Sequence, residues 1–167
     1  MKRLLLMRHA KSDRNVGSTS DFERPLNYRG RKDATKMARF LVQKQLIPDI
    51  VLFSPARRTT ETWERINTIF QENCCSITGY PIKDFYLAGL GQIQEAFSDT
   101  FNHFKTALIL GHNPGWSKAS SLLSQKNVNL TAADVVILEH PSDTWEEAIY
   151  SDEWHFQNHF TPTSVRL

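Results

Sequence analysis

The chain contains very little cysteine. Its 167 residues include only Cys74 and Cys75, which are adjacent to each other. Adjacent cysteines cannot form an ordinary disulfide framework, so the sequence is unlike the disulfide-rich scaffolds of small secreted proteins. We therefore expect the protein to reside in a reducing compartment, the cytoplasm.

The sequence also lacks a long hydrophobic run. No stretch of about 18 uninterrupted apolar residues is present, which is the length that a membrane-spanning helix needs. The first apolar run, residues 4–7, is short and leads straight into charged residues, a pattern unlike that of a signal peptide. We expect no membrane span and no membrane partner.

A large net charge is missing as well. The chain has 20 Lys and Arg against 18 Asp and Glu, a formal charge of +2 at pH 7, which is too small to predict a nucleic-acid partner. The charges are unevenly distributed, because residues 1–32 hold nine basic and three acidic residues, whereas residues 134–167 hold one basic and seven acidic residues. The basic N-terminal block favours a small anionic ligand.

What the sequence does contain is an alternation of short apolar runs and helical patterns. The predicted strands are residues 4–7, 49–53, 80–83, 107–110, 135–138 and 154–160, and the predicted helices are residues 28–45, 54–70, 93–104 and 114–123. Residues 10–27 are polar and aperiodic, which predicts a surface loop. Right-handed crossovers between such strands predict a single α/β domain over residues 1–167, with a mostly parallel central sheet.

The predicted helices carry recognisable start signals. Asn27, Ser54 and Asn113 are the expected N-caps, and Pro55 and Pro114 are expected at first helical positions. The signals at Ser54 and Asn113 place two of these helices shortly after strands, as expected for layers of helices packed on a central sheet.

Charged side chains follow three of the predicted strands. Arg8 and His9 come directly after the first strand, and His112 follows the fourth. Arg57 and Arg58 lie in the first turn after the second strand, where cations oppose the helix dipole unless an anion binds there. Alone, His9 could be an ordinary loop histidine. Because ligands bind at the carboxyl edge of open α/β sheets, the three strand ends together predict one anion-binding crevice.

Two histidines and two arginines in one crevice suit phosphoryl transfer. Guanidinium groups bind phosphate oxygens bidentately and stay charged at any relevant pH. One imidazole can attack phosphorus, while the other, if protonated, can stabilise the equatorial oxygens. We therefore expect neither a metal nor another cofactor. His155 and His159 could bind zinc from a helix, but the alternating aromatic residues around them predict a strand.

Four motifs carry a resemblance to a known family. In their order and spacing, LLLMRHAKSDRN, RPLNYRG, SPARRTTET and LGHNPG resemble the histidine phosphatase (phosphoglycerate mutase-like) superfamily, especially its short SixA-type phosphohistidine phosphatases. The resemblance covers about residues 3–140. It implies a three-layer phosphoglycerate mutase-like fold, with helices on both faces of the sheet, and no metal requirement.

The resemblance also implies roles for individual residues. His9 would be the phosphorylated nucleophile, and Arg8, Arg58 and His112 would complete the phosphate pocket. The family pattern S-P-x-x-R places the pocket arginine four residues after the serine, which selects Arg58 over its neighbour Arg57.

Two further residues are candidates for substrate binding. Asn15 falls where the family often has an asparagine that faces phosphate, and Ser12 lies in the same loop. The family's usual glycine after Arg-His is Ala10 here, which is still small.

The sequence departs from the family at the proton donor. Many members have a carboxylic acid in the segment that matches residues 85–91, which reads FYLAGLG here and offers only Tyr86. Among nearby carboxylates, Asp13 is best placed by sequence position and Asp21 lies in the same loop. A solvated aspartate is ionised at neutral pH, so we predict that no carboxylate is an essential acid.

These features favour a metal-independent phosphatase with a phosphohistidine enzyme intermediate, acting as a monomer. Its partner would be a phosphorylated small molecule or a phosphohistidine-containing protein, since an imidazole leaving group needs little protonation. A phosphomutase is an alternative that needs an enclosed pocket. A non-catalytic module that binds phosphate or phosphopeptide is another, although binding alone does not require His9.

Overall fold

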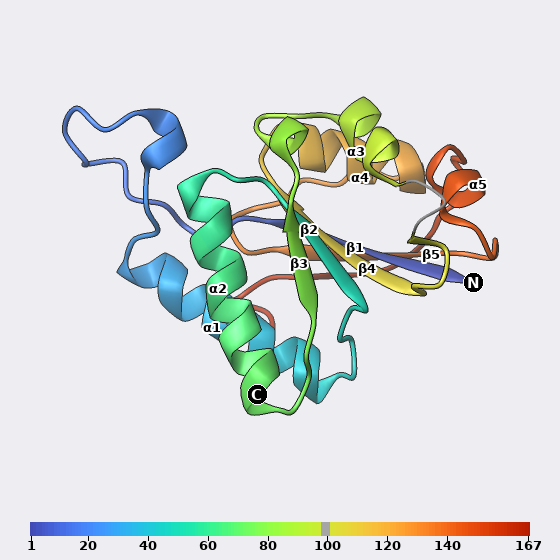
Figure 1. Cartoon of the computed structure of the whole chain (residues 1–167), viewed down its shortest axis with the longest axis horizontal. Helices are drawn as coiled ribbons and strands as arrows, with labels where there is room; N and C mark the ends of the chain where they lie inside the picture. The colour runs from blue at the N-terminus through green and yellow to red at the C-terminus, as the bar shows by residue number, and fades with distance from the viewer. Residues whose placement is uncertain (98–100) are drawn as a thin grey trace.

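The computed structural model describes residues 1–97 and 101–167. Within these residues a six-stranded sheet forms the centre of the molecule, in the order β3-β2-β4-β1-β5-β6 (Figure 1). The strands are β1 (Lys2–Arg8), β2 (Ile50–Phe53), β3 (Thr78–Pro81), β4 (Thr106–Gly111), β5 (Val135–His140) and β6 (His155–Phe160). The first four strands pair in parallel, whereas β5 pairs antiparallel with β1 and with β6. The prediction of a mostly parallel sheet is confirmed.

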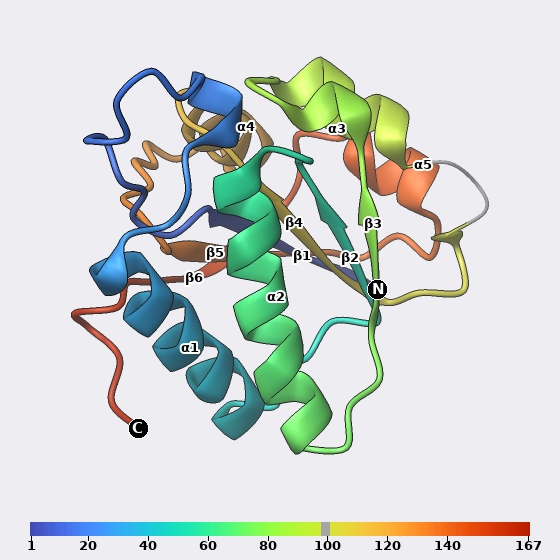
Figure 2. The ribbon, with the colours of Figure 1, turned by 60° about the vertical axis from the view of Figure 1, so that its left-hand side comes forward.

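Helices cover both faces of this sheet. The helices are α1 (Tyr28–Gln43), α2 (Arg57–Glu72), α3 (Leu90–Ala96), α4 (Gly115–Ser124) and α5 (Trp145–Ile149), with 3-10 turns η1 (Asp21–Glu23) and η2 (Lys83–Phe85) in the connections. Figure 2 shows α1 and α2 side by side over one face, and their apolar residues share one core. Residues of α3, α4 and α5 form the core on the other face. The predicted three-layer arrangement is confirmed.

Strand β1 contributes to both cores at once. Successive strand side chains point to opposite faces, so Leu4 and Leu6 pack with α4 and α5, whereas Leu5 and Met7 pack with α1 and α2. All four side chains are fully buried. This explains why the sequence shows a continuous apolar run there instead of an alternating one.

The helix starts agree with the sequence only in part. Asn27 caps α1 as predicted, because its side chain accepts a hydrogen bond from the backbone N–H of Gly30. The predicted start at Ser54 and Pro55 is wrong, since α2 begins at Arg57 and Ala56 is its N-cap. Ser54 instead continues the pairing of β2 with β4, through a hydrogen bond from its backbone N–H to the carbonyl oxygen of Leu110.

The third predicted helix is shorter than its apolar spacing indicated. α3 ends at Ala96, and Phe97 has extended backbone angles of φ −96° and ψ 95°. Residues 98–100 of that prediction lie outside the described residues. Phe101 and Phe104 pack against the core beyond the helix. Aromatic side chains are long enough to reach a core from a turn, so their spacing resembled a helical face without being one.

The predicted loop at residues 10–27 is irregular but closely folded. It contains η1, and Ser12 forms an isolated antiparallel bridge with Leu26. Ala10 and Leu26 are buried in the core that α1 and α2 cover. Both ends of the loop are therefore fixed beside β1, the strand that His9 follows.

The final strand was predicted correctly, and His155 and His159 lie on it. The ring of His159 is hydrogen-bonded to the buried carboxylate of Asp134 at 3.0 Å. In the described part of the chain, no group of three or more His, Cys, Asp or Glu residues is placed to hold a metal ion. No helix of that part is long and apolar enough to cross a membrane.

We expect Gly115→Ala to destabilise the fold. A Cβ atom at Gly115 would lie 1.6 Å from the carbonyl oxygen of Ala88, so backbone would have to move. Such overpacking costs about 1–3 kcal/mol, which should lower the unfolding temperature by several degrees. Gly91→Ala is the matched control, because a Cβ there meets nothing within 4 Å. Equal unfolding temperatures for the two variants in a thermal melt would contradict this account.

Candidate active site

The site lies where β1, β2 and β4 end at one edge of the sheet. Arg8, the last residue of β1, is in register with Gly111, the last residue of β4. His9 and His112 therefore begin the two following segments, and the centroids of their rings are 5.3 Å apart. Arg58, from the first turn of α2, donates a hydrogen bond from Nε to Nε2 of His9 at 3.3 Å. The predicted meeting of these residues is confirmed by the geometry.

The hydrogen bonds of His9 define its tautomer. Its Nδ1 lies 2.7 Å from the carbonyl oxygen of Ala10, which can only accept, so Nδ1 carries the proton. Nε2 then holds the lone pair that faces Arg58. Burial lowers the pKa of His9 to about 3, and the positive charges of Arg58 and Arg8 act in the same direction. At neutral pH this ring is an uncharged imidazole with a lone pair at Nε2, which is the form that attacks an electrophile.

His112 is fixed by Ser54. Nε2 of His112 lies 2.7 Å from the hydroxyl oxygen of the fully buried Ser54. Burial lowers the pKa of His112 to about 3, with further contributions from His9 and Arg58. Among the described residues, Nδ1 of His112 has no hydrogen-bond partner although it is buried. A bound oxyanion could provide that partner.

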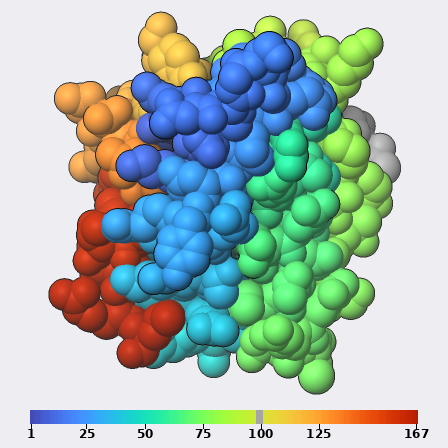
Figure 3. Space-filling model, turned by 90° about the vertical axis from the view of Figure 1, so that its left-hand side faces the viewer, coloured from blue at the N-terminus to red at the C-terminus, as the bar shows by residue number. Residues whose placement is uncertain are grey.

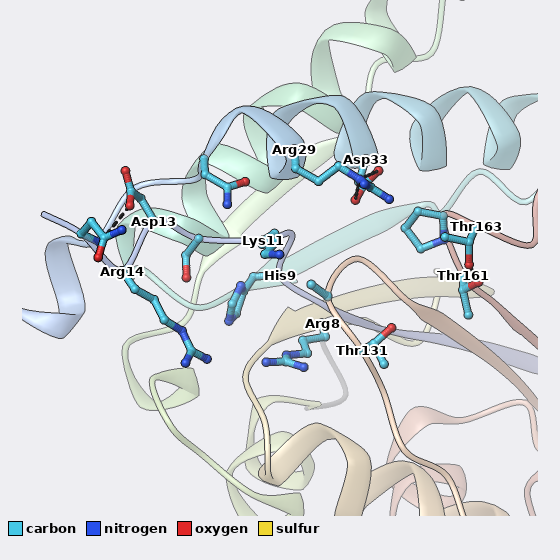
Figure 4. Close-up of a pocket in the computed structure, with 15 residues that line it drawn as sticks. Arg8, His9, Lys11, Asp13, Arg14, Arg29, Asp33, Thr131, Thr161 and Thr163 are labelled. Atoms are coloured by element: carbon cyan, nitrogen blue, oxygen red, sulfur yellow. Dashed lines mark hydrogen bonds and ion pairs between the residues drawn. The ribbon is translucent and has the colours of Figure 1, made fainter.

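Arg8 has a similar free donor. Its Nη1 donates to the carbonyl oxygen of Leu130 at 3.2 Å, while its buried Nε has no partner within the described chain. Burial lowers the pKa of the guanidinium, and the nearby charges of Arg14 and Arg58 add to this effect. Figure 4 shows the side chains of Arg8 and His9 close together among the residues that line the groove. The unpartnered donor and the clustered positive charge both favour an anion here.

The two neighbouring arginines of α2 have different surroundings. The Arg58 side chain is 3% exposed, and its Nη1 donates to the backbone oxygen of Asp21 at 2.7 Å. Arg57 is exposed and pairs with Glu61 on the same helix at 2.9 Å. Arg58 is therefore buried against His9 whereas Arg57 is exposed, an arrangement that agrees with the family pattern S-P-x-x-R.

Asp21 and Tyr86 are site residues to which the sequence gave little weight. The Tyr86 hydroxyl donates to Oδ2 of Asp21 at 2.5 Å, and the same oxygen accepts from Nη2 of Arg58 at 3.1 Å. The Tyr86 ring also stands edge-on to His112, with centroids 5.5 Å apart. Asp21 lies 37 positions before Arg58 in an aperiodic loop, so no local pattern indicated this contact.

These contacts determine which groups can donate a proton. The hydrogen bond from Tyr86, with the charge of Arg58, lowers the pKa of Asp21 to about 2, so its carboxylate is ionised at neutral pH. Burial and the neighbouring Asp21 raise the pKa of Tyr86. Asp13, the carboxylate favoured by sequence position, lines the same groove as His9, and its carboxylate accepts a hydrogen bond from the backbone N–H of Asn15. Among the described residues Asp21, and not Asp13, is the carboxylate hydrogen-bonded to Arg58.

The remaining candidates, Ser12 and Asn15, line an open groove of about 740 Å³ that also includes Arg8 and His9 (Figure 4). The Ser12 hydroxyl accepts from Nη1 of Arg24, and Asn15 is exposed. Within the described residues neither side chain is hydrogen-bonded to the two arginines and two histidines of the pocket. Their role in substrate binding stays a prediction.

Comparisons with known proteins agree with this geometry. The model of the histidine phosphatase superfamily (branch 1) matches residues 4–75. An uncharacterised chloroplastic protein of Arabidopsis thaliana is 32% identical over 154 residues, which are 88% of this chain and 70% of that protein.

Solved structures share the fold over nearly the whole chain. A protein of Agrobacterium tumefaciens, solved as a candidate phosphohistidine phosphatase SixA, has a TM-score of 0.79 at 20% identity and covers 96% of this chain and 98% of its own. The protein histidine phosphatase SixA, solved with tungstate, has a TM-score of 0.79 at 18% identity, and the match covers 98% of this chain and 99% of that protein. The chain belongs to the histidine phosphatase superfamily, and its fold is that of the SixA structures.

Proposed function

We propose that this protein is a metal-independent phosphatase in which His9 carries the phosphoryl group as a covalent intermediate. One observation carries the proposal: a buried, neutral His9 presents the lone pair of Nε2 to a pocket of positive charge. Membership of the histidine phosphatase superfamily supports it. The favoured substrate is phosphohistidine of a protein partner, or another phosphate with a good leaving group.

Substrate binding would be electrostatic. The guanidinium groups of Arg8 and Arg58 would hold the phosphate oxygens, which would also satisfy the free Nε of Arg8. An arriving dianion favours the protonated form of a nearby imidazole, so it would raise the pKa of His112 from its resting value of about 3. A protonated His112, held by Ser54, would then stabilise the equatorial oxygens as charge develops in the transition state.

The reaction would proceed in two displacements. The lone pair of His9 Nε2 attacks phosphorus, and the bond from phosphorus to the leaving group breaks, which releases the dephosphorylated product. A water molecule then attacks the phosphohistidine, giving inorganic phosphate and regenerating Nε2. The Nδ1 hydrogen bond to Ala10 keeps the ring oriented throughout.

The supply of a proton to the leaving group determines which substrates can react. Asp21 is ionised at neutral pH, and Tyr86 has a raised pKa, so neither is a ready acid. A phosphohistidine substrate needs little help, because its leaving imidazole is a much weaker base than an alkoxide. The open groove beside His9 suits a phosphoryl group presented by a larger molecule.

We expect phosphate labelling of His9 during turnover. Wild-type enzyme quenched in chelator should carry an acid-labile, base-stable phosphoryl group, and His9→Ala should lose both label and activity with an unchanged melting curve. His155→Ala, in which an exposed β6 histidine is removed, is the control and should label normally.

Three outcomes would contradict the proposal. An unlabelled, inactive wild type would indicate a binding module. A label that persists in His9→Ala would exclude this nucleophile, and activity that is lost in chelator and restored by zinc or manganese would exclude a metal-independent reaction.

We expect the two neighbouring arginines to differ sharply in kinetics. Arg58→Ala removes a charge-assisted contact to the transferring group, which should cost about 3 kcal/mol, or about 10²-fold in kcat/KM. Arg57→Ala removes only a surface ion pair and should stay near wild type. A greater loss in Arg57→Ala, measured with an aryl phosphate, would show that the wrong arginine has been assigned.

We also expect the rate to depend steeply on the leaving group. Without an essential acid, kcat/KM should fall strongly from aryl to alkyl phosphates as the pKa of the leaving group rises. Asp21→Asn should lower all rates by a similar factor, because it weakens the positioning of Arg58. Asp13→Asn should leave the series unchanged. A shallow wild-type slope that steepens in either variant would identify that aspartate as the acid.

A further inference from the structure

The groove at His9 continues into a second depression along α1. The first depression includes Arg8, His9, Lys11, Arg14 and Arg29. The second, of about 620 Å³, is lined by residues of α1, by Arg65 of α2 and by the C-terminal residues. The two depressions share several lining residues, Arg29, Asp33, Pro162 and Thr163, so they form one continuous surface.

This surface is strongly basic. Figure 3 faces it, with the first loop in darker blue above α1, and α2 beside them. We define the basic face by the exposed cationic side chains that line the two depressions: Lys11, Arg14, Arg29, Lys32, Arg39 and Arg65. The formal charge of the whole chain is only +2, so this concentration of charge is local.

Few acidic groups neutralise the basic face. Asp33 is paired with Arg29 at 3.2 Å, and Asp13 is hydrogen-bonded to backbone. Glu64 and Glu72 lie near its edge beside Arg65. Five of the six cations have no acidic partner within 4 Å among the described residues: Lys11, Arg14, Lys32, Arg39 and Arg65. The face therefore presents positive charge that a partner could neutralise.

The basic face is too long for one phosphate group. The positions of Arg29, Lys32 and Arg39 place them along one side of α1, and a rise of about 1.5 Å per residue separates the first from the last by about 15 Å. A single phosphoryl group at His9 would contact only the nearest end. The rest of the face fits an extended acidic surface that accompanies the phosphoryl group.

We propose that the basic face docks acidic residues of the protein that presents phosphohistidine to His9. This inference rests on the proposed function. The face leads directly to His9, so whatever occupies it lies beside the reacting phosphoryl group. The site favours a good leaving group such as imidazole, which a nucleic acid does not offer. Complementary charge would raise the association rate and lower KM without changing the chemical step.

The test uses two histidine-phosphorylated peptides of 20 residues, one with glutamates on both sides of the phosphohistidine and one with glutamines at the same positions. Wild-type kcat/KM should be at least about 10-fold higher for the glutamate peptide at low ionic strength, and salt should remove this preference. The triple variant Lys32→Glu, Arg39→Glu, Arg65→Glu should lose the preference through KM, while hydrolysis of an aryl phosphate stays unchanged.

A matched control keeps the total charge change equal. The control is a second triple variant, Lys105→Glu, Lys118→Glu, Lys126→Glu, which alters exposed lysines outside the basic face. This variant should retain the preference for the glutamate peptide. If the glutamate variant of the basic face does not fold, the corresponding glutamine variant takes its place. Equal kcat/KM for the two peptides in wild type, or a preference that survives in the triple variant, would overturn the inference.

Binding measurements separate this inference from the proposed function. Fluorescence anisotropy with the unphosphorylated glutamate peptide measures binding without turnover. The peptide should bind to wild type and to His9→Ala in a salt-sensitive manner. The triple variant of the basic face should not bind it. Absence of that binding would overturn the inference even in an active phosphatase. Duplex DNA that competes as strongly as the peptide would identify a nucleic-acid surface and would also overturn it.

Discussion

The parallel pairing of β1 with β4 is the constraint on which the site depends. Its register sets Arg8 opposite Gly111, so both strands end at the same level and deliver His9 and His112 side by side. Because side chains alternate along a strand, a slip of one residue would exchange the two buried faces of β1. The apolar side chains packed on each face oppose such a slip. Core packing thus fixes the spacing of the two imidazoles.

Burial then determines the protonation state of those imidazoles. Both pKa values fall to about 3 because the rings are buried beside the positive charges of Arg8 and Arg58. In the unfolded chain the imidazoles of His9 and His112 take up protons near pH 6.5. In the folded chain these two imidazoles take up protons only at a much lower pH. Fold stability should therefore decrease as the pH falls from about 6.5 towards 3. The burial that keeps both imidazoles neutral also makes the fold sensitive to acid.

The irregular first loop has two roles. At one end Asp21 holds the guanidinium of Arg58 through both its backbone oxygen and its carboxylate. At the other end, Lys11 and Arg14 line the groove that runs towards α1. The edge of the sheet thus positions His9 and His112, while the loop holds Arg58 and extends the groove beside His9.

Much of this protein could be predicted from local sequence. The apolar runs determined the strands, and their order indicated a mostly parallel sheet. Arg8, His9 and His112 were found because polar residues directly follow buried strands. Arg58 was selected over Arg57 because it matches the S-P-x-x-R pattern of the family that the sequence resembles. Each of these inferences uses residues that are close in sequence, where periodicity and motif spacing are informative.

Only the tertiary structure decided the contacts between distant segments. The pairing of Asp21 with Arg58, the burial of Ser54 against His112 and the end of α3 at Ala96 have no periodic signal in the sequence. Each depends on how irregular backbone packs against an element far away in the chain. The sequence therefore predicted which groups form the candidate site, whereas three-dimensional packing decided how those groups are oriented and which of them are charged, because burial and neighbouring charge set each pKa.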